Sequence, residues 1–268
     1  MTPIFDSHVH IYPDAIAGKA VKALGEFYTF PVGGEGTYTD LTEAYRPLGL
    51  CGMLLFCVAT NPKQVMRVND SIAGAVSRAR GDGFAAIGFG GMHQDYPAMR
   101  EEVGRCASLG LRGIKLHPDI QGEAVDSEQF LPLYEELERR GMFLYLHVGD
   151  NRPAYRFSSP DRVRRIALQF PSLRIIAAHL GGYMAWDEAP VLYGLENVFF
   201  DCSSTLWALR SDDTVRLLRA CGVSRVLYGT DYPVMTPARH LALFNALPLT
   251  DAEREEILIG NARRLFGI

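Results

Sequence analysis

The stretch PIFDSHVH, residues 3–10, opens the chain with apolar residues that favour a strand and ends with two histidines. Side chains two positions apart on a strand point to the same face. His8 and His10 are therefore expected side by side at the end of this strand. Two neighbouring imidazoles in such a place form a ready pair of metal ligands.

Seven further apolar runs follow, near residues 51–59, 84–92, 111–117, 142–148, 173–180, 197–203 and 225–231. They are too short for buried helices and end in glycine, proline or polar residues, which favours strands. Several are apolar at consecutive positions, as is typical of a parallel sheet whose faces are covered by helices.

Helical patterns separate these runs, at residues 62–80, 96–109, 127–140, 160–170 and 211–221, with two further helical stretches in 236–268. Strand and helix thus alternate about once per 33 residues, which predicts one domain over residues 1–268 folded as a distorted (β/α)8 TIM barrel. An open doubly wound sheet is the alternative, but no GxGxxG motif follows an early strand. Residues 11–48 are the least regular, and they contain the stretch PVGGEG (31–36), where we expect a long loop over the barrel mouth.

The charge balance excludes several classes of partner. The chain has 27 Lys and Arg against 31 Asp and Glu, a formal net charge of −4. No basic patch is dense enough to predict nucleic-acid binding. The first residues lack the basic start and apolar segment that would predict a signal peptide, and no apolar stretch is long enough for a membrane span. We therefore expect a cytoplasmic protein that acts on a small molecule.

The C-terminal ends of all strands in a TIM barrel meet at one face, and polar residues of this chain gather at those positions. They are His8, His10, Lys115, His117, His147, His179 and Asp231. A single buried histidine is usually a hydrogen-bonded core residue, but several independent placements agree here. Three histidines and a carboxylate suit Zn²⁺, and also Fe²⁺ or Mn²⁺. Ligands from distant parts of the chain favour an open, catalytic site with water on the metal.

Five motifs of the chain, taken together, resemble a known family. They are DSHVH (6–10), GIKLHP (113–118), LYLHVG (144–149), AAHLGG (177–182) and YGTDYP (228–233). In this order they resemble the amidohydrolase superfamily of metal-dependent hydrolases, and within it the family related to 2-amino-3-carboxymuconate-6-semialdehyde decarboxylase. The motifs span nearly the whole chain, so the resemblance implies the same barrel fold throughout.

The resemblance also implies roles for individual residues. His8, His10 and His147 correspond to metal ligands, and Asp231 corresponds to the last ligand, which also hydrogen-bonds the metal-bound water. His179 corresponds to the histidine that polarises the substrate or shuttles a proton. These roles agree with the chemistry, because an aspartate beside a cation stays ionised and a histidine titrates near neutral pH. Asp231 and His179 are thus the expected catalytic residues.

The expected substrate contacts are less specific. Some members of the superfamily carry a carboxylated lysine on the fourth strand that bridges two metals. The chain resembles the one-metal members more closely, so Lys115 is expected to contact the substrate or support the structure, and a two-metal centre is the alternative. His117 shares the strand face of Lys115. The loop arginines Arg152 and Arg210 suit a substrate carboxylate, although solvated surface positions explain them equally well.

Two reactions fit this set of residues. We expect a metal-dependent hydrolase with one Zn²⁺, in which metal-bound water attacks a small cyclic amide, lactone or ester. The alternative is a non-oxidative decarboxylase of a small unsaturated or aromatic carboxylic acid, because both reactions use the same ligands. The complete residue set argues against a barrel that only binds metal. Dimers are frequent among the proteins that the chain resembles, so a homodimer is the expected assembly.

Overall fold

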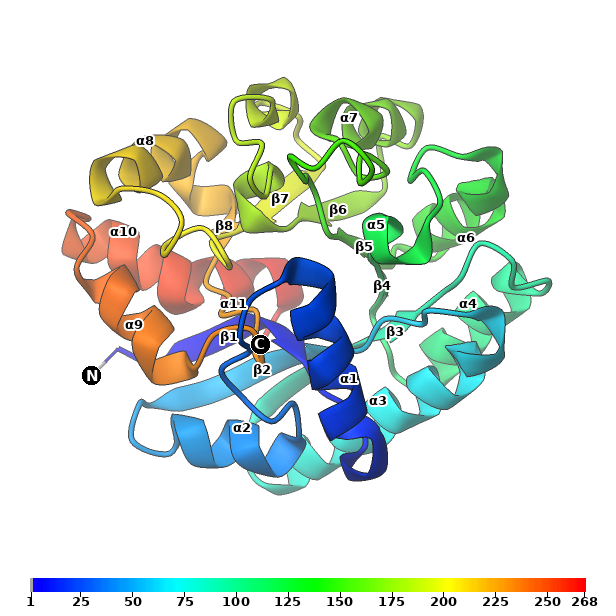
Figure 1. Ribbon diagram of the computed structural model, residues 1–268, viewed down its shortest axis with the longest axis horizontal. Helices are drawn as coiled ribbons and strands as arrows, with labels where there is room; N and C mark the ends of the chain where they lie inside the picture. Colours follow the sequence, from blue (N-terminus) through cyan, green and yellow to red (C-terminus); the bar gives the residue numbers. More distant parts are fainter. Residues whose placement is uncertain (1) are drawn as a thin grey trace.

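The computed structural model describes residues 2–268, which contain eight parallel strands closed into a barrel and surrounded by helices (Figure 1). The strands are β1 (Ile4–His10), β2 (Leu50–Phe56), β3 (Ala85–Gly91), β4 (Gly113–Leu116), β5 (Phe143–Leu146), β6 (Arg174–Ala177), β7 (Val198–Asp201) and β8 (Val226–Leu227). Each strand pairs with the next one in chain order. The predicted (β/α)8 barrel is confirmed.

The barrel is distorted where β8 meets β1, because β8 is only two residues long. The segment that follows β8 closes the gap with backbone hydrogen bonds. The amide of Ser7 donates to the carbonyl oxygen of Tyr228, the amide of His10 donates to that of Tyr232, and the amide of Asp231 donates to that of His8. This closure brings the residues after β8 directly beside the two histidines of β1.

The helices after the strands are α3 (Val65–Gly81), α4 (Met99–Ser108), α5 (Pro118–Gln121), α6 (Leu131–Arg140), α7 (Pro160–Gln169), α8 (Ser211–Cys221), α9 (Pro237–Asn245), α10 (Asp251–Glu255) and α11 (Asn261–Phe266). Five of them (α3, α4, α6, α7 and α8) agree with the predicted ones to within a few residues, whereas α5 was not predicted and residues 236–268 contain three α-helices where two stretches were expected. Local signals explain their ends. Gly141 ends α6 in the left-handed conformation with a φ of 63°, which glycine adopts without strain.

Residues 11–48, the least regular part of the sequence, contain two helices that the sequence analysis did not predict. They are α1 (Asp14–Tyr28) and α2 (Tyr38–Tyr45). Helix α1 lies across the mouth of the barrel (Figure 1), and Ala20, Leu24 and Phe27 line the cavity beneath it. Their spacing of four and three residues places them on one helix face. The expected loop at residues 31–36 lies in the irregular segment 29–37 between the two helices.

The apolar core fills one end of the barrel, and the polar residues lie at the other end. Buried aromatic side chains fill the barrel interior, and Phe266 of α11 packs against Phe5 and Phe143, with ring centroids 5.9 and 5.3 Å away. The strand ends opposite Phe266 carry the polar residues described below. Among the described residues, no helix combines the length and apolar character needed to cross a membrane.

Candidate metal centre

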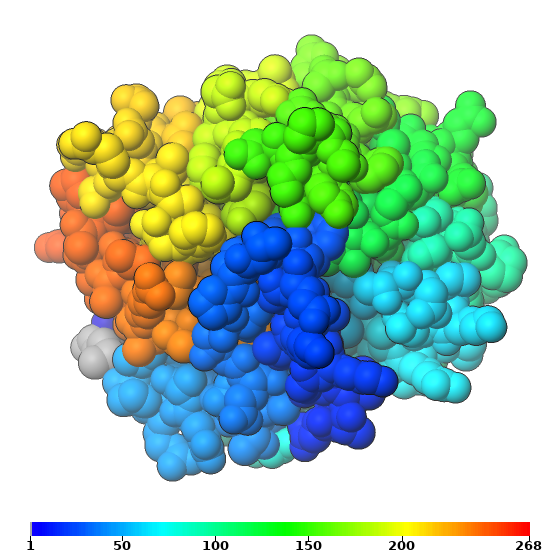
Figure 2. All heavy atoms as spheres, viewed as in Figure 1, coloured from blue at the N-terminus to red at the C-terminus, as the bar shows by residue number. Residues whose placement is uncertain are grey.

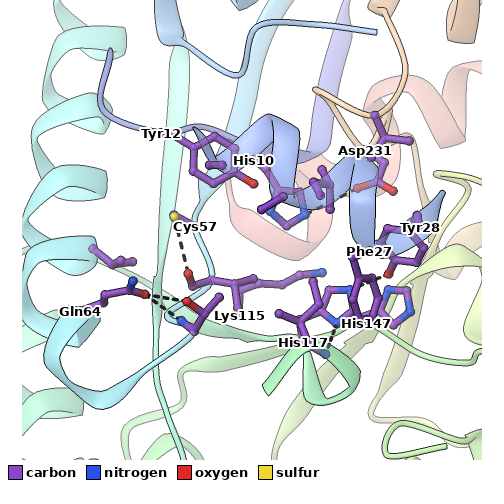
Figure 3. Close-up of a pocket in the computed structure, with 18 of the residues that line it drawn as sticks. His10, Tyr12, Phe27, Tyr28, Cys57, Gln64, Lys115, His117, His147 and Asp231 are labelled. Carbon is purple, nitrogen blue, oxygen red and sulfur yellow. Dashed lines mark hydrogen bonds and ion pairs between the residues drawn. The ribbon is translucent and has the colours of Figure 1, made fainter. Parts of the chain in front are cut away.

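One cavity of about 610 Å³ lies between the C-terminal strand ends and α1. All seven polar residues that the sequence analysis places at strand ends line it: His8, His10, Lys115, His117, His147, His179 and Asp231. Each is buried, with at most 8% of its surface exposed. Figure 3 shows several of them pointing toward one another from different strands. The remaining wall is largely apolar and includes the inner face of α1.

His8 is held in one orientation by a carboxylate of β7. Its Nδ1 lies 2.9 Å from Oδ2 of Asp201, so the Nδ1–H donates to that carboxylate. Asp201 also accepts hydrogen bonds from the hydroxyls of Tyr145 and Ser203. Because the proton of neutral His8 is on Nδ1, its Nε2 presents a lone pair to the cavity. This arrangement of a carboxylate behind a histidine is common among metal ligands.

Three electron-rich atoms meet on the cavity side of His8. The Nε2 atom of His8 lies 3.1 Å from Oδ1 of Asp231 and 3.2 Å from Nε2 of His10. The Nε2 atom of His10 lies 3.5 Å from the same Asp231 oxygen. Lone pairs at such separations repel each other unless a cation, either a proton or a metal ion, lies between them. The donor set of two imidazoles and a carboxylate therefore fits a divalent metal.

The pKa values of His8, His10 and Asp231 in the metal-free protein also show that this cluster favours a positive charge. Burial and Lys115 oppose protonation of His8, but Asp231 and Asp201 outweigh them and raise the pKa of this histidine. Burial opposes ionisation of Asp231, yet His8, His179 and His10 hold the pKa of this carboxyl well below its usual value. Burial, helped by the charge of His8, keeps the pKa of His10 well below its usual value. Asp231 is thus ionised and His10 is neutral, as metal ligands need to be.

His147 and His179 form a second pair of facing nitrogens. The Nε2–H of His147 donates to the carbonyl oxygen of Gly149 at 2.9 Å, which turns its Nδ1 toward Nε2 of His179 at 3.0 Å. The Nδ1–H of His179 donates in turn to the carbonyl oxygen of Ser203 at 3.0 Å. Both facing atoms are therefore lone-pair donors in the neutral rings. Burial lowers the pKa of His179 to about 4.

The clustering differs in one respect from the predicted ligand set. The nitrogens of His8 and His179 and an oxygen of Asp231 lie within 4.8 Å of one another, whereas His147 belongs to a second such group with His117 and Asp119. His10 contacts the first group through His8 and Asp231. The structure thus brings His8, His10, Asp231 and His179 together directly, and His147 joins them through its contact with His179.

Backbone strain accompanies the site. His179, Ser204 and Asp231 have φ values of 60°, 46° and 61°. Residues other than glycine rarely adopt this left-handed conformation, which costs on the order of 1–3 kcal/mol and persists where surrounding contacts enforce it. Ser204 donates a hydrogen bond to Oδ2 of Asp231 at 2.6 Å, which is one such contact.

Helix α1 covers the cavity and is fastened at its C-terminal end. In the space-filling view of Figure 2 this blue segment lies over the barrel mouth. The hydroxyl of Tyr28 lies 2.7 Å from Nε2 of His117. Since Nδ1 of His117 accepts from the amide of Ile120, its Nε2–H donates to the Tyr28 oxygen. The expected substrate contact His117 is thus in the cavity but already bonded to the helix that covers it.

The two predicted arginine contacts lie elsewhere. Arg152 donates to both carboxylate oxygens of the buried Asp150 and to the carbonyl oxygen of Phe27, and its guanidinium lies 4.1 Å from the ring centroid of Tyr155. Arg210 is exposed at the start of α8. Neither lines the cavity. The structure gives no support to their role in substrate binding, because one is paired within the protein and the other faces solvent.

Sequence reasoning missed two residues of the site. Asp201 ends the apolar run of β7, so the rule that selected the other strand ends also selects it. Tyr28 belongs to the unpredicted helix α1. Asp6, which shares the strand face of His8 by spacing, accepts hydrogen bonds from Tyr45, Thr230 and the backbone amide of His8.

A parallel barrel with an imidazole and carboxylate cluster at its C-terminal strand ends is the architecture of a metal-dependent barrel enzyme. The model of the Amidohydrolase family matches residues 5–268, so the chain belongs to this family. The predicted resemblance is confirmed.

Three similar proteins are all named as decarboxylases. Gamma-resorcylate decarboxylase of a Rhizobium species is 28% identical over 75% of each chain. The 2-amino-3-carboxymuconate-6-semialdehyde decarboxylase of Dictyostelium discoideum is 23% identical over 75% of this chain and 66% of that protein. A dihydroxybenzoic acid decarboxylase of Polaromonas, crystallised with manganese and 2-nitroresorcinol, is 17% identical with a TM-score of 0.75, covering 100% of this chain and 97% of that one. The last similarity shows the fold alone.

These comparisons correct the order of preference in the sequence analysis. The curated relatives are decarboxylases, so hydrolysis of an amide, lactone or ester is not supported as the main reaction, and the decarboxylase alternative is favoured. Both reactions use the same ligands, which is why the residues alone could not separate them. The preference for zinc likewise has no support from the Polaromonas structure, which contains manganese.

Proposed function

We propose that the chain is a non-oxidative decarboxylase of a small aromatic or unsaturated carboxylic acid. The observation that carries the proposal is the cluster of His8, His10 and Asp231, whose facing lone pairs require a cation, in a chain whose curated relatives are decarboxylases. A homodimer and a cytoplasmic location remain predictions from the sequence. Size-exclusion chromatography tests the first.

We assign one divalent metal to His8, His10, His147 and Asp231, with His179 beside it. When bound, such an ion supplies a positive charge that draws electron density from substrate oxygens. A second metal in the group of His117, Asp119 and His147 is disfavoured. His117 is bonded to Tyr28, and Asp119 accepts hydrogen bonds from Ser158 and from the amide of Phe157. Mn²⁺ and Zn²⁺ are the candidates to load first.

The reaction requires a proton for the carbon that loses CO₂. The C–C bond to the carboxylate breaks, its electron pair stays on the substrate carbon, and that carbon takes a proton, so no water is consumed. The proton comes from solvent, and His179 is placed to relay it, because its Nδ1–H is held by the carbonyl oxygen of Ser203 and the lone pair on its Nε2 can take up a proton and pass it to the carbon. Asp231 remains ionised, with Oδ1 facing His8 and His10 and Oδ2 accepting a hydrogen bond from Ser204.

The experiment is decarboxylation by metal-loaded protein. 2,6-Dihydroxybenzoate is incubated with the Mn²⁺ or Zn²⁺ form, and CO₂ and resorcinol are quantified. The expected result is one CO₂ per resorcinol, with no oxygen from labelled water in the resorcinol. Asp231→Asn should keep the fold but lose at least about a hundredfold in kcat. Turnover of lactones or esters without CO₂ release from any aromatic or unsaturated acid would overturn the proposal.

A further inference from the structure

Lys115 is a buried cation with no partner. It lies in β4, and its side chain extends into the cavity toward the histidines (Figure 3). Only 1% of its surface is exposed, and Nζ has no hydrogen-bond partner among the described residues. Almost every other buried polar group of this site is bonded, including Asp201, His117 and His147. Lys115 is therefore the group whose contacts are left incomplete.

Aromatic rings compensate this charge in part. The Nζ atom lies 4.9 Å from the ring centroid of Phe56 and 4.4 Å from that of Tyr145. The same two rings pack against His8, with centroids 5.1 and 5.2 Å away, so Nζ lies next to the metal cluster. Cation–π contacts stabilise an ammonium, but they do not replace the hydrogen bonds that it makes in water. A protein keeps such a group where something else supplies the missing acceptor.

No other residue of the cavity is suited to hold a buried anion. Among the described residues that line it, the only other lysine or arginine is Lys19, which is exposed on α1. Arg152 is already paired with Asp150. Much of the remaining lining is apolar and includes Ala20, Leu24 and Phe27 of α1 and Ile120 after β4. One end of the cavity thus offers a single cation, and the remainder offers apolar contact.

We propose that Lys115 binds the carboxylate of the substrate and thereby restricts the site to carboxylic acids with an apolar or aromatic body. This inference deepens the proposed function and rests on it. The ammonium donates to the carboxylate beside the metal, while the body of the acid packs against α1. Loss of neutral CO₂ removes the charged partner of Lys115, so the neutral product is held more weakly than the acid.

This role belongs to binding more than to the chemical step. An ammonium that pairs with the carboxylate stabilises the bound acid and, while the C–C bond is still breaking, stabilises the transition state to a similar extent. Such an interaction lowers KM without raising kcat. The lysine therefore acts as a specificity residue, and its loss should appear in KM and in the preference for acids over neutral compounds.

The test compares Lys115→Met with Lys19→Met in the metal-loaded protein. Methionine keeps an unbranched apolar stem that reaches as far as Cε of lysine, and it removes the ammonium. Two ligand pairs are compared: 2,6-dihydroxybenzoate with resorcinol, which lacks the carboxylate, and benzoate with benzamide, which replaces the carboxylate by a neutral group of similar shape. Calorimetry measures all four affinities. The ratio of the affinity for each acid to that for its neutral counterpart should fall about tenfold or more in Lys115→Met. A fall of this size corresponds to the loss of a hydrogen bond between charged groups. Lys19→Met should stay within about threefold of the wild type.

A structural role of Lys115 predicts the opposite pattern. It would lower the affinity for acids and neutral compounds alike and lower the melting temperature. We expect the Met variant to bind resorcinol and benzamide as the wild type does and to melt at the same temperature or higher, because a buried unpaired charge is removed. Equal acid preference in wild type and Lys115→Met, or failure of both acids to bind the wild type, would overturn the proposal.

The decarboxylation assay separates this inference from the proposed function. If acids bind through Lys115 and no CO₂ is released, the reaction is wrong and the carboxylate site stands. If wild type and Lys115→Met release CO₂ with the same KM, the reaction stands and the carboxylate site is wrong. If both proposals hold, KM rises about tenfold or more in Lys115→Met and kcat changes by less than about threefold.

Discussion

The Nδ1 atom of His8 lies 2.9 Å from Oδ2 of Asp201, a residue 193 positions away in the chain. This contact fixes which nitrogen of His8 carries the proton, and it points Nε2 at Asp231 and His10. Asp201 is itself held by Ser203 and Tyr145, and its pKa lies well below the usual value, because His8 and His179 outweigh the effect of burial. An ionised carboxylate behind an imidazole makes that imidazole a stronger ligand.

Asp201→Asn should therefore weaken metal binding without removing any proposed ligand. The amide still accepts a hydrogen bond but carries no charge, and we expect the affinity for Mn²⁺ or Zn²⁺ to fall about 10- to 100-fold. Competition with a fluorescent chelator measures this affinity. Asp213→Asn, on the exposed first turn of α8, is the matched control. An unchanged affinity in Asp201→Asn would show that the contact does not tune the metal.

Metal binding should weaken as the pH falls. The pKa of His8 is raised in the metal-free protein, so below that pKa the imidazole carries a proton that a cation has to displace. The affinity for the metal should fall with decreasing pH and reach a plateau above the raised pKa, and binding should release protons. Calorimetry in buffers of different ionisation enthalpy counts these protons. Binding without proton release would contradict the proposed role of His8.

Removal of the metal should also lower the stability of the fold. A ligand at about 100 times its Kd stabilises the folded state by about 2.7 kcal/mol. Treatment with a chelator should thus lower the melting temperature by several degrees, and addition of Mn²⁺ or Zn²⁺ should restore it. His8→Ala is the control, because its melting temperature should no longer respond to the metal. A wild-type protein that melts at the same temperature with and without metal would contradict the assignment.

The sequence predicted the barrel well because its strands are short, apolar and regularly spaced, and each is separated from the next by a helical pattern. It failed at α1 for a local reason. The helix contains Gly18 and Gly25, which lower helix propensity, and many of its inward-facing residues are small. Their periodic spacing was nevertheless present at Ala20, Ala23, Leu24 and Phe27.

The candidate site was predictable where topology alone decides position. His8, His10, His147, His179 and Asp231 follow strands, so the barrel gathers them whatever their neighbours are. Arg152 was not predictable in this way, because a loop residue goes where its nearest partner holds it. Asp150, two residues earlier, takes its guanidinium. The detailed grouping of His147 and His179 depends on side-chain hydrogen bonds that spacing does not encode.

A larger side chain on the inner face of α1 should block the substrate without affecting the metal. Ala20 lines the cavity, whereas Lys22, two residues further, has 75% of its side chain exposed. Ala20→Phe should raise KM about tenfold, since overpacking costs on the order of 1–3 kcal/mol, and metal affinity should stay the same. Lys22→Phe should leave both unchanged. Equal KM values in the two variants would show that the substrate does not reach α1.

Arg152→Ala should loosen α1 rather than remove a substrate contact. The guanidinium donates to the carbonyl oxygen of Phe27 at 2.7 Å and packs against the rings of Phe27 and Tyr155, so its loss frees the C-terminal end of the helix that covers the cavity. Hydrogen exchange over residues 14–36 should accelerate, and KM should rise for acids and for neutral ligands alike, because the wall of the cavity becomes mobile. Arg210→Ala, on the exposed start of α8, should change neither measurement. If Arg152→Ala instead weakened only the acids and left hydrogen exchange of α1 unchanged, the arginine would be a direct carboxylate contact, as its position in the sequence first indicated, and the covering helix would be held by other contacts, such as the bond between Tyr28 and His117.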